Sequence, residues 1–301
     1  MEAPLVLTLL IAPFAILISF FWVRDRWDKE PTPLLWLLLG TGGFSVIPIA
    51  VLGLVLEGTD LNFESFNKIH RIAFTSFITA GTIEEGVKYL LAILITFNHK
   101  YFTEEYDGIY YAVAVSLGFA FVENIMYVLQ GIGGGVLGTA IIRAFTAVPL
   151  HAACGVVLGY HLGMAKFTND RSRQITILVK GLLAAIFFHG IYDFFAFSSS
   201  GLEKEYIPWS YIALGITLFV LWAYCNMLIK DAMIVSARRH GLKHAKMMTP
   251  VNIVKEIKRT VRVEPANPLI SRKLGISYCD RCGKIVSPTA IFCPGCGSEI
   301  N

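Results

Sequence analysis

Charged side chains are scarce in this chain: only 16% of its 301 residues are Asp, Glu, Lys or Arg, whereas 55% are hydrophobic. Soluble globular domains carry about 25% charged residues, so this composition excludes the soluble class. The apolar residues lie in blocks of about 20 or more, the helical length that crosses a hydrocarbon core of roughly 30 Å. The sequence therefore predicts an all-α polytopic membrane bundle.

The first apolar block lacks the features of a cleaved signal peptide. No basic residues precede it, it has no small-residue cleavage site, and a charged stretch follows it directly. We therefore expect it to be retained as one of about seven transmembrane helices. Their approximate ranges are Pro4–Val23, Pro33–Leu56, Ile72–Phe97, Gly108–Leu129, Leu137–Met164, Ile175–Phe197 and Ile207–Ile229.

The distribution of Lys and Arg predicts how these helices are oriented. Basic residues of short loops stay on the cytoplasmic side of a membrane, and the first, third and fifth loops hold more of them than the others. We expect a cell-membrane protein whose N-terminus lies outside the cell and whose tail from Lys230 lies in the cytoplasm. This tail has 13 basic and five acidic residues. Attraction to the lipid bilayer explains the excess, so no nucleic-acid partner is expected.

Two C-x-x-C pairs stand near the C-terminus. Cys279 and Cys282 form the first and Cys293 and Cys296 the second, with ten residues between the pairs. Four thiolates at this spacing close the tetrahedral coordination of a structural Zn²⁺. Disulfides are the alternative, but a reducing compartment disfavours them. The sequence predicts a small Cys₄ zinc ribbon in the cytoplasm, whose role would be to dock a partner.

These features divide the chain into three expected parts. Residues 1–230 form the transmembrane domain, residues 231–274 a basic juxtamembrane linker, and residues 275–301 the zinc ribbon. Within the linker, Thr249-Pro250 is a helix start. Hydrophobic and basic residues follow it at helical spacing, which fits either an amphipathic helix on the membrane surface or a solvated helix.

Ionisable and amide side chains interrupt four of the apolar blocks. A charge at the bilayer centre costs roughly 2.5–3.5 kcal/mol, so such residues must face one another or water. Several lie about 20 Å into their helices, at the rise of about 1.5 Å per residue, which places them near the midplane. We expect one polar cavity enclosed by the third, fourth, fifth and sixth spans, lined by Glu84, Glu85, Lys88, Glu123, Asn124, Arg143, His151, His189 and Asp193.

The set lacks a serine or cysteine beside a base, so direct attack by water is favoured over an acyl-enzyme. Amide hydrolysis then needs a base, an oxyanion donor and a proton donor. Glu84 or Glu85 could be the base, held by Lys88 or a histidine. Asn124 and a protonated histidine could bind the oxyanion.

The sequence leaves the presence of an active-site metal open. No H-E-x-x-H helix is present, which excludes the zincin arrangement. Four acids face two permanent cations, so two negative charges are in excess while both histidines are neutral. Either carboxyl groups share protons or a divalent ion neutralises the excess. Its candidate ligands are His151, His189, Glu85, Glu123 and Asp193.

The order and spacing of these motifs resemble those of the PrsW-type intramembrane proteases. The matching motifs are Glu84-Glu85-x-x-Lys88, Phe119-x-x-x-Glu123-Asn124, His151, and His189-x-x-x-Asp193. This family is distantly related to the CAAX prenyl endopeptidases, but Lys88 and Glu123 depart from the CAAX pattern. The resemblance spans roughly residues 5–229. It implies hydrolysis of a peptide bond in a membrane-protein or peptide substrate such as an anti-sigma factor.

Two other functions are compatible with parts of the sequence. An ion-coupled transporter also places acids and histidines at the midplane, but transporters usually contain repeated halves, and no such repeat is evident. A scaffold or receptor acting through its ribbon would leave the intramembrane residues unexplained. The sequence favours the protease.

Overall fold

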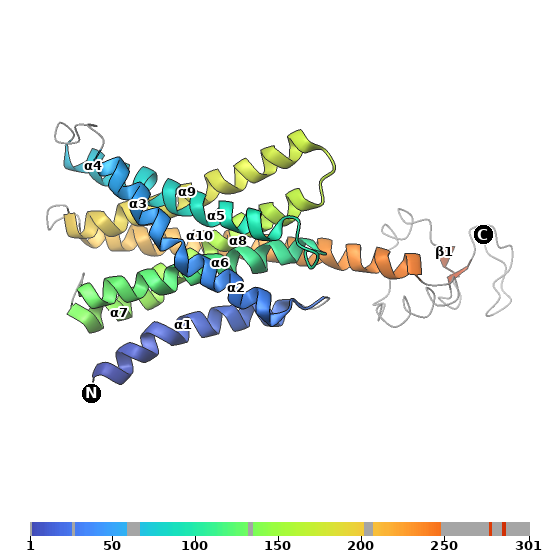
Figure 1. Ribbon diagram of the computed structural model, residues 1–301, viewed down its shortest axis with the longest axis horizontal. Coiled ribbons are helices and arrows are strands. Elements are labelled where there is room, and N and C mark those ends of the chain that lie inside the picture. Colours follow the sequence, from blue (N-terminus) through green and yellow to red (C-terminus); the bar gives the residue numbers. More distant parts are fainter. Residues whose placement is uncertain are drawn as a thin grey trace. The chain divides into compact units, whose positions relative to one another are not determined.

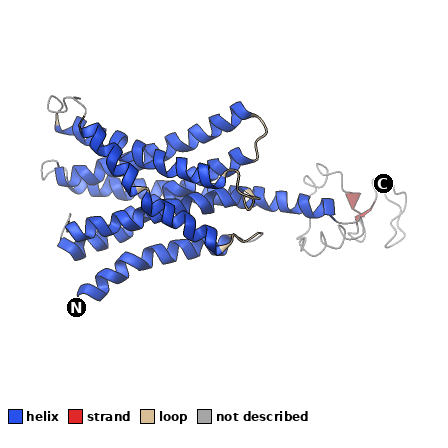
Figure 2. Ribbon diagram, viewed as in Figure 1, coloured by secondary structure: helices blue, strands red, loops and turns tan. Residues whose placement is uncertain are grey.

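The structure is a computed structural model that describes residues 2–25, 28–58, 67–131, 135–201, 207–247, 277–278 and 285–286. It divides into two compact units, Met1–Leu242 and Lys243–Asn301. Helices make up the first unit (Figures 1 and 2). They are α1 (Glu2–Arg24), α2 (Thr32–Phe44), α3 (Val46–Glu57), α4 (Lys68–Phe74), the π-helix η2 (Thr75–Thr82), α5 (Ile83–Thr96), α6 (Glu105–Gln130), α7 (Gly135–Phe145), α8 (Ala147–Lys166), α9 (Arg171–Gly201) and α10 (Ile207–Met247).

The predicted membrane bundle is confirmed. Within the described residues, six helical segments are long and apolar enough to cross a membrane, namely Ala3–Arg24, Thr32–Leu56, Glu105–Gln130, Gly135–Lys166, Arg171–Ser199 and Ile207–Gly241. The remaining predicted span, Ile72–Phe97, is helical as the consecutive α4, η2 and α5. It is less apolar because it contains Glu84, Glu85 and Lys88.

Helix α6 lies at the centre of the bundle and packs closely against α8. Glycines make this approach possible, because a Cβ added at Gly159 would lie 2.3 Å from the Gly108 carbonyl oxygen, and one added at Gly108 would lie 2.5 Å from the Gly159 oxygen. On another face of α6, a Cβ at Gly118 would lie 2.1 Å from the Leu39 oxygen of α2. Small residues at such crossings are typical of membrane helices, whose association depends on close packing.

Large apolar side chains cover the outside of the bundle. Phe44, Leu94, Leu129 and Phe219 each expose at least 70% of their surface. Lipid tails are as apolar as these side chains, so they need no protein partner in a bilayer. Cys154 and Cys225 are fully buried, as expected of core residues.

The π-helix η2 precedes the two adjacent glutamates and packs on α9. At Gly81 an added Cβ would lie 3.2 Å from the Ile186 oxygen of α9, and at Gly190 of α9 it would lie 2.3 Å from the Phe77 ring of η2. Short π segments inside α-helices frequently mark functional sites. Here the segment brings the start of α5 against the part of α9 that carries His189.

Helix α10 differs from the expected last span. The apolar run ends near Ile229, yet the helix continues to Met247. The added segment is rich in Ala, Met, Lys and Arg, which favour helix, and holds no proline before Pro250.

In the second unit, two short strands, β1 (Ser277–Tyr278) and β2 (Ile285–Val286), pair in antiparallel register. The four ribbon cysteines and the predicted linker helix from Thr249 lie outside the described residues. The boundaries at residues 230 and 274 stay predictions.

Candidate active site

The structure brings all the predicted intramembrane polar residues into one network of contacts. Five helices contribute to it, since the fifth predicted span is divided into α7 and α8. Helix α5 carries Glu84, Glu85 and Lys88, helix α6 carries Glu123 and Asn124, helix α7 carries Arg143, helix α8 carries His151, and helix α9 carries His189 and Asp193. These residues therefore lie together in the structure, as the sequence predicted.

Glu85 lies at the centre of the network. Its side chain is fully buried, and its Oε1 atom lies 2.6 Å from Lys88 Nζ and 2.6 Å from His189 Nδ1. Lys88 Nζ is also 3.3 Å from His151 Nδ1 and 4.4 Å from the centre of the Phe119 ring. A cation inside a membrane needs such partners, because its desolvation is not otherwise offset.

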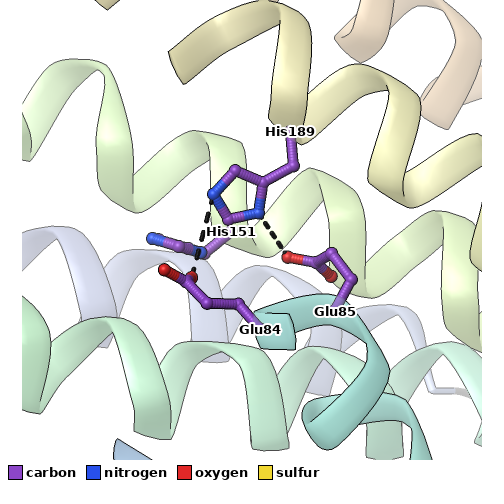
Figure 3. A group of neighbouring side chains, drawn as sticks. All are labelled: Glu84, Glu85, His151 and His189. Carbon is purple, nitrogen blue, oxygen red and sulfur yellow. Dashed lines mark hydrogen bonds and ion pairs between the residues drawn. The ribbon is translucent and has the colours of Figure 1, made fainter. Parts of the chain in front are cut away.

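His189 connects the two glutamates and a third acid. Figure 3 shows its ring between Glu84 and Glu85, with one nitrogen directed at each. The Nδ1 atom faces Glu85, while Nε2 lies 3.8 Å from Glu84 Oε2 and 3.2 Å from Asp193 Oδ2. Asp193 is one helical turn beyond His189. Carboxylates placed this way fix the orientation of an imidazole.

Glu123 joins His151 to Arg143. Its Oε2 atom lies 2.6 Å from Arg143 Nη2 and 3.0 Å from His151 Nε2. The Arg143 Nε group donates to Asn124 Oδ1 at 2.9 Å, which fixes the orientation of that amide. The Asn124 Nδ2 group is then buried with no hydrogen-bond partner among the described residues.

Four of these side chains have the composition and spacing of a metal site. Donor atoms of Glu84, Glu85, His151 and His189 all lie within 4.8 Å of one another. The Oε2 atoms of Glu84 and Glu85 are buried and have no hydrogen-bond partner among the described residues. Imidazole and carboxylate donors suit Zn²⁺ and related transition metals, so these residues fit such an ion.

The charges of the network agree with this fit. Four carboxylates, those of Glu84, Glu85, Glu123 and Asp193, contact Lys88, Arg143 and the two histidines. A divalent ion or protonated imidazoles would balance them. Glu123 and Asp193, also predicted as ligands, lie outside the group of four, and each contacts one of its histidines.

Sequence reasoning assigned no role to several neutral neighbours. Phe119 lies beneath the Lys88 ammonium group, and the Tyr127 ring lies 4.0 Å from the Arg143 guanidinium carbon. The Tyr192 hydroxyl donates to Thr146 Oγ1 at 2.9 Å. Phe119 and Tyr127 are each four residues from Glu123 on α6, so the helical repeat could have placed them on the same face.

Comparison with known proteins decides among the functions considered. A model of the PrsW family of intramembrane metalloproteases matches residues 30–224, which include every residue of the network. This chain belongs to the PrsW family. It is an intramembrane protease, and neither the transporter nor the scaffold receives support.

The match to curated members of the PrsW family spans most of the length of each relative. Protease PrsW of Bacillus subtilis (strain 168) is 36% identical over 70% of this chain and 88% of the relative. Protease PrsW of Clostridioides difficile (strain 630) is 34% identical, over 71% and 86%. That of Geobacillus kaustophilus (strain HTA426) is 33% identical, over 74% and 89%. No solved structure matches the chain.

This PrsW-family chain also has a zinc-ribbon domain after the protease domain. The zinc-ribbon domain model matches residues 278–300. This confirms the predicted zinc ribbon and its place at the C-terminus. Coordination of one ion by Cys279, Cys282, Cys293 and Cys296 stays a prediction.

Proposed function

We propose that Glu84 is the general base of this protease and that Glu85 positions Lys88 and His189. The observation that carries the assignment is the difference between the two carboxylates. Glu85 is fully enclosed and holds two partners at 2.6 Å. The Glu84 side chain is 12% exposed, and its nearest ion-pair partners are 3.5 and 3.8 Å away. Glu84 is therefore the carboxylate that can receive a proton from water.

In the proposed reaction a water oxygen attacks the carbonyl carbon of the scissile peptide bond. Its proton passes to Glu84 and then to the leaving nitrogen, which departs as an amine when the C–N bond breaks. The buried Asn124 Nδ2 group, which has no partner among the described residues, donates to the oxyanion. Fixed donors of this kind stabilise the charge that develops in the transition state.

The same residues support an active-site metal. Glu85, His151 and His189 would hold the ion, because catalytic zinc sites use three protein ligands and keep a position open. Such an ion would lower the pKa of a water molecule and polarise the substrate carbonyl. The chain's own contribution is to orient both imidazoles, His151 through Glu123 and His189 through Asp193.

Glu84→Gln tests the assignment, because it keeps the shape of the side chain and removes the base. Purified wild-type and variant proteins would be incubated with detergent-solubilised membranes from cells that lack the protease, and new fragments would be identified by mass spectrometry. General-base catalysis contributes typically 10²–10⁴-fold, so we expect a loss of that order with an unchanged thermal midpoint.

Asp170→Asn, in the exposed loop before α9, serves as the control and should cleave normally. Full activity of Glu84→Gln would contradict the assignment. Activity that is lost together with the folded protein would assign Glu84 a structural role instead.

The zinc ribbon is proposed to bind one structural Zn²⁺ and to dock a partner in the cytoplasm. The C-x-x-C spacing supports the zinc site, and the basic tail supports the cytoplasmic location. A ribbon that binds the substrate or an adaptor would raise the local concentration of substrate near the membrane domain.

A further inference from the structure

A second group of buried acids lies outside the active site. Asp25 and Glu30 belong to the connection between α1 and α2, and Glu104 and Asp107 belong to the start of α6. Each of the four exposes 3% of its surface or less. Acidic side chains are almost never buried to this degree unless they are paired.

Local hydrogen bonds account for part of this group. Asp107 Oδ2 accepts from the backbone N–H groups of Thr103 and Glu104 at 2.7 and 2.9 Å, and the Glu104 side chain accepts from the Asp107 backbone in return. This is a capping box that begins α6. Asp25 Oδ2 accepts from the Glu30 backbone N–H at 3.3 Å. These bonds explain one oxygen each of Asp25 and Asp107.

The other oxygens have no such explanation. Asp25 Oδ1, Asp107 Oδ1 and both carboxylate oxygens of Glu30 are buried without a hydrogen-bond partner in the described part of the chain. The bonds of Asp25 and Asp107 therefore do not explain why the Glu30 carboxylate is buried. The charges of Asp25 and Glu104 act on Glu30, and the charge of Glu30 acts on Asp107, so the four acids lie near one another.

Positive side chains near the group are directed elsewhere. Lys29 Nζ lies 4.8 Å from the centre of the Trp22 ring, and the Arg24 guanidinium lies 3.5 Å from the centre of the Phe20 ring. Among the described residues, no Lys or Arg forms an ion pair with Asp25, Glu30 or Asp107. Burial raises the pKa of Glu30 to about 8, although the Tyr111 hydroxyl opposes the rise, so its charge is costly here.

The spacing of the acids suits a single ion. One oxygen from each of Asp25, Glu104 and Asp107 lies within 4.8 Å of the others. Two oxygens bound to one Ca²⁺ at about 2.3–2.6 Å can be at most about 5 Å apart. A set of donors that contains only oxygen selects a hard cation over Zn²⁺ or Cu²⁺.

We propose that Asp25, Glu104 and Asp107 bind a divalent, oxygen-preferring cation, Mg²⁺ or Ca²⁺, separate from the protease site, and that the charge of Glu30 beside them strengthens the binding. The ion would fasten the connection between α1 and α2 to the start of α6, the helix that carries Glu123 and Asn124. It therefore stabilises the frame on which the active site is built. Mg²⁺ requires regular octahedral geometry with several waters, whereas Ca²⁺ accepts six to eight irregular oxygens.

Terbium luminescence tests the proposal on the full-length, zinc-loaded protein in detergent. Tb³⁺ replaces hard cations, and excited Tyr side chains sensitise its emission. Tyr110 and Tyr111 lie close enough to act electrostatically on Glu30. We expect saturable emission that Mg²⁺ or Ca²⁺ displaces, and the ion that does so at the lower concentration identifies the natural ligand. The same ion should raise the thermal midpoint.

The decisive variant is Glu30→Gln, because it removes the charge but keeps the shape of the side chain and the backbone N–H that donates to Asp25, whereas Asp107→Asn would disturb the start of α6. We expect Glu30→Gln to weaken Tb³⁺ binding by at least about tenfold, since a negative charge beside the three ligands is lost. Asp28→Asn, an exposed acid of the same connection that accepts from Thr103 Oγ1, is the matched control and should bind normally. Glu84→Gln should also bind normally, which separates this signal from the intramembrane site.

Two results would overturn the proposal. The first is an absence of saturable emission in the wild-type protein, together with a Glu30→Gln variant that is more stable whether or not the cation is present. That result would show that the acids are held neutral by protons. The second is emission that Glu84→Gln abolishes and Glu30→Gln leaves unchanged, which would place the ion in the active site.

Discussion

His189 Nδ1 lies 2.6 Å from Glu85 Oε1, although 104 positions separate the two residues in the sequence. The contact joins α5 to α9 at a depth where neither side chain meets bulk water, since both are at least 97% buried. Its partners on either side, Lys88 and Asp193, extend it into a continuous chain of four contacting side chains.

Substitutions at His189 and Asp193 should reduce proteolysis to different degrees. His189→Ala removes a group that contacts both glutamates, and we expect a loss of about 10²–10⁴-fold. Asp193→Asn keeps the size of the side chain and weakens only the orientation of His189, so a loss of about 10–100-fold is expected. Fragment formation in detergent, where no ion gradient exists, provides the measurement. Equal activity of both variants and the wild type would contradict these roles.

Lys88→Met should destabilise the bundle strongly. It leaves the fully buried Glu85 carboxylate without its 2.6 Å cation, and breaking a buried ion pair costs about 3–5 kcal/mol. The free energy of unfolding, from SDS titration of the detergent-solubilised protein, measures the effect. The double variant Lys88→Met/Glu85→Gln should recover much of the loss because it removes the unpaired charge. A double variant as unstable as the single one would show that Lys88 acts through packing alone.

Gly159→Ala should test the crossing of α6 and α8. The added methyl would lie 2.3 Å from the Gly108 oxygen, and overpacking of this kind costs typically about 1–3 kcal/mol. Gly53→Ala in α3 is the matched control, because an added Cβ there meets nothing within 4 Å, and it should be neutral or slightly stabilising. Thermal midpoints in detergent compare the two. Similar midpoints would mean that the two helices can separate slightly at little cost.

The metal content of a ribbon variant should distinguish zinc bound by the ribbon from any ion bound by the intramembrane residues. In Cys279→Ser/Cys282→Ser, the four-thiolate set is halved, so one zinc per chain should be lost while any ion bound by the intramembrane residues remains. Elemental analysis of the purified wild type and the double variant gives the count. A wild type with one zinc and a double variant with none would leave the intramembrane residues without a metal and favour Glu84 as a metal-free base.

Removal of the ribbon should affect processing in cells more than hydrolysis itself. Every residue of the active-site network lies before Leu274, so a chain that ends there should still cleave in detergent. Processing of the native substrate in cells should weaken if the ribbon docks it. A truncated chain that is folded but inactive in detergent would show that the ribbon belongs to the active unit. Labelling of Cys279 by an impermeant thiol reagent on intact cells would contradict the predicted topology.

Local sequence patterns were sufficient to find the residues that the structure joins in the buried polar network. Glu85 and Lys88 are three residues apart and His189 and Asp193 four apart, so the helical repeat alone places each pair on one face. The cost of charge in a bilayer then required the pairs to meet. The repeat could not show that Glu85 rather than Glu84 would be the enclosed carboxylate, because that depends on how α9 approaches α5 across η2.

The buried acids near the start of α6 could not be identified as a group from local sequence patterns. Asp25 and Glu30 follow a span, where charged residues are ordinary, and Glu104 and Asp107 begin a helix, where acids are favoured. Each has an unremarkable local explanation in the sequence. Only the folding of the α1–α2 connection against the start of α6 brings oxygens of three of them within 4.8 Å.

The sequence by itself determined the membrane class, the expected spans, the zinc ribbon and the set of polar residues at the site, because hydrophobicity, helical repeat and cysteine spacing act over short stretches of chain. The tertiary structure decided which partners meet. It joins His189 to Glu85 and His151 to Glu123, and it uses glycines to set the distance between α6 and α8. Those choices depend on the fit of whole helices against one another, which no local pattern contains.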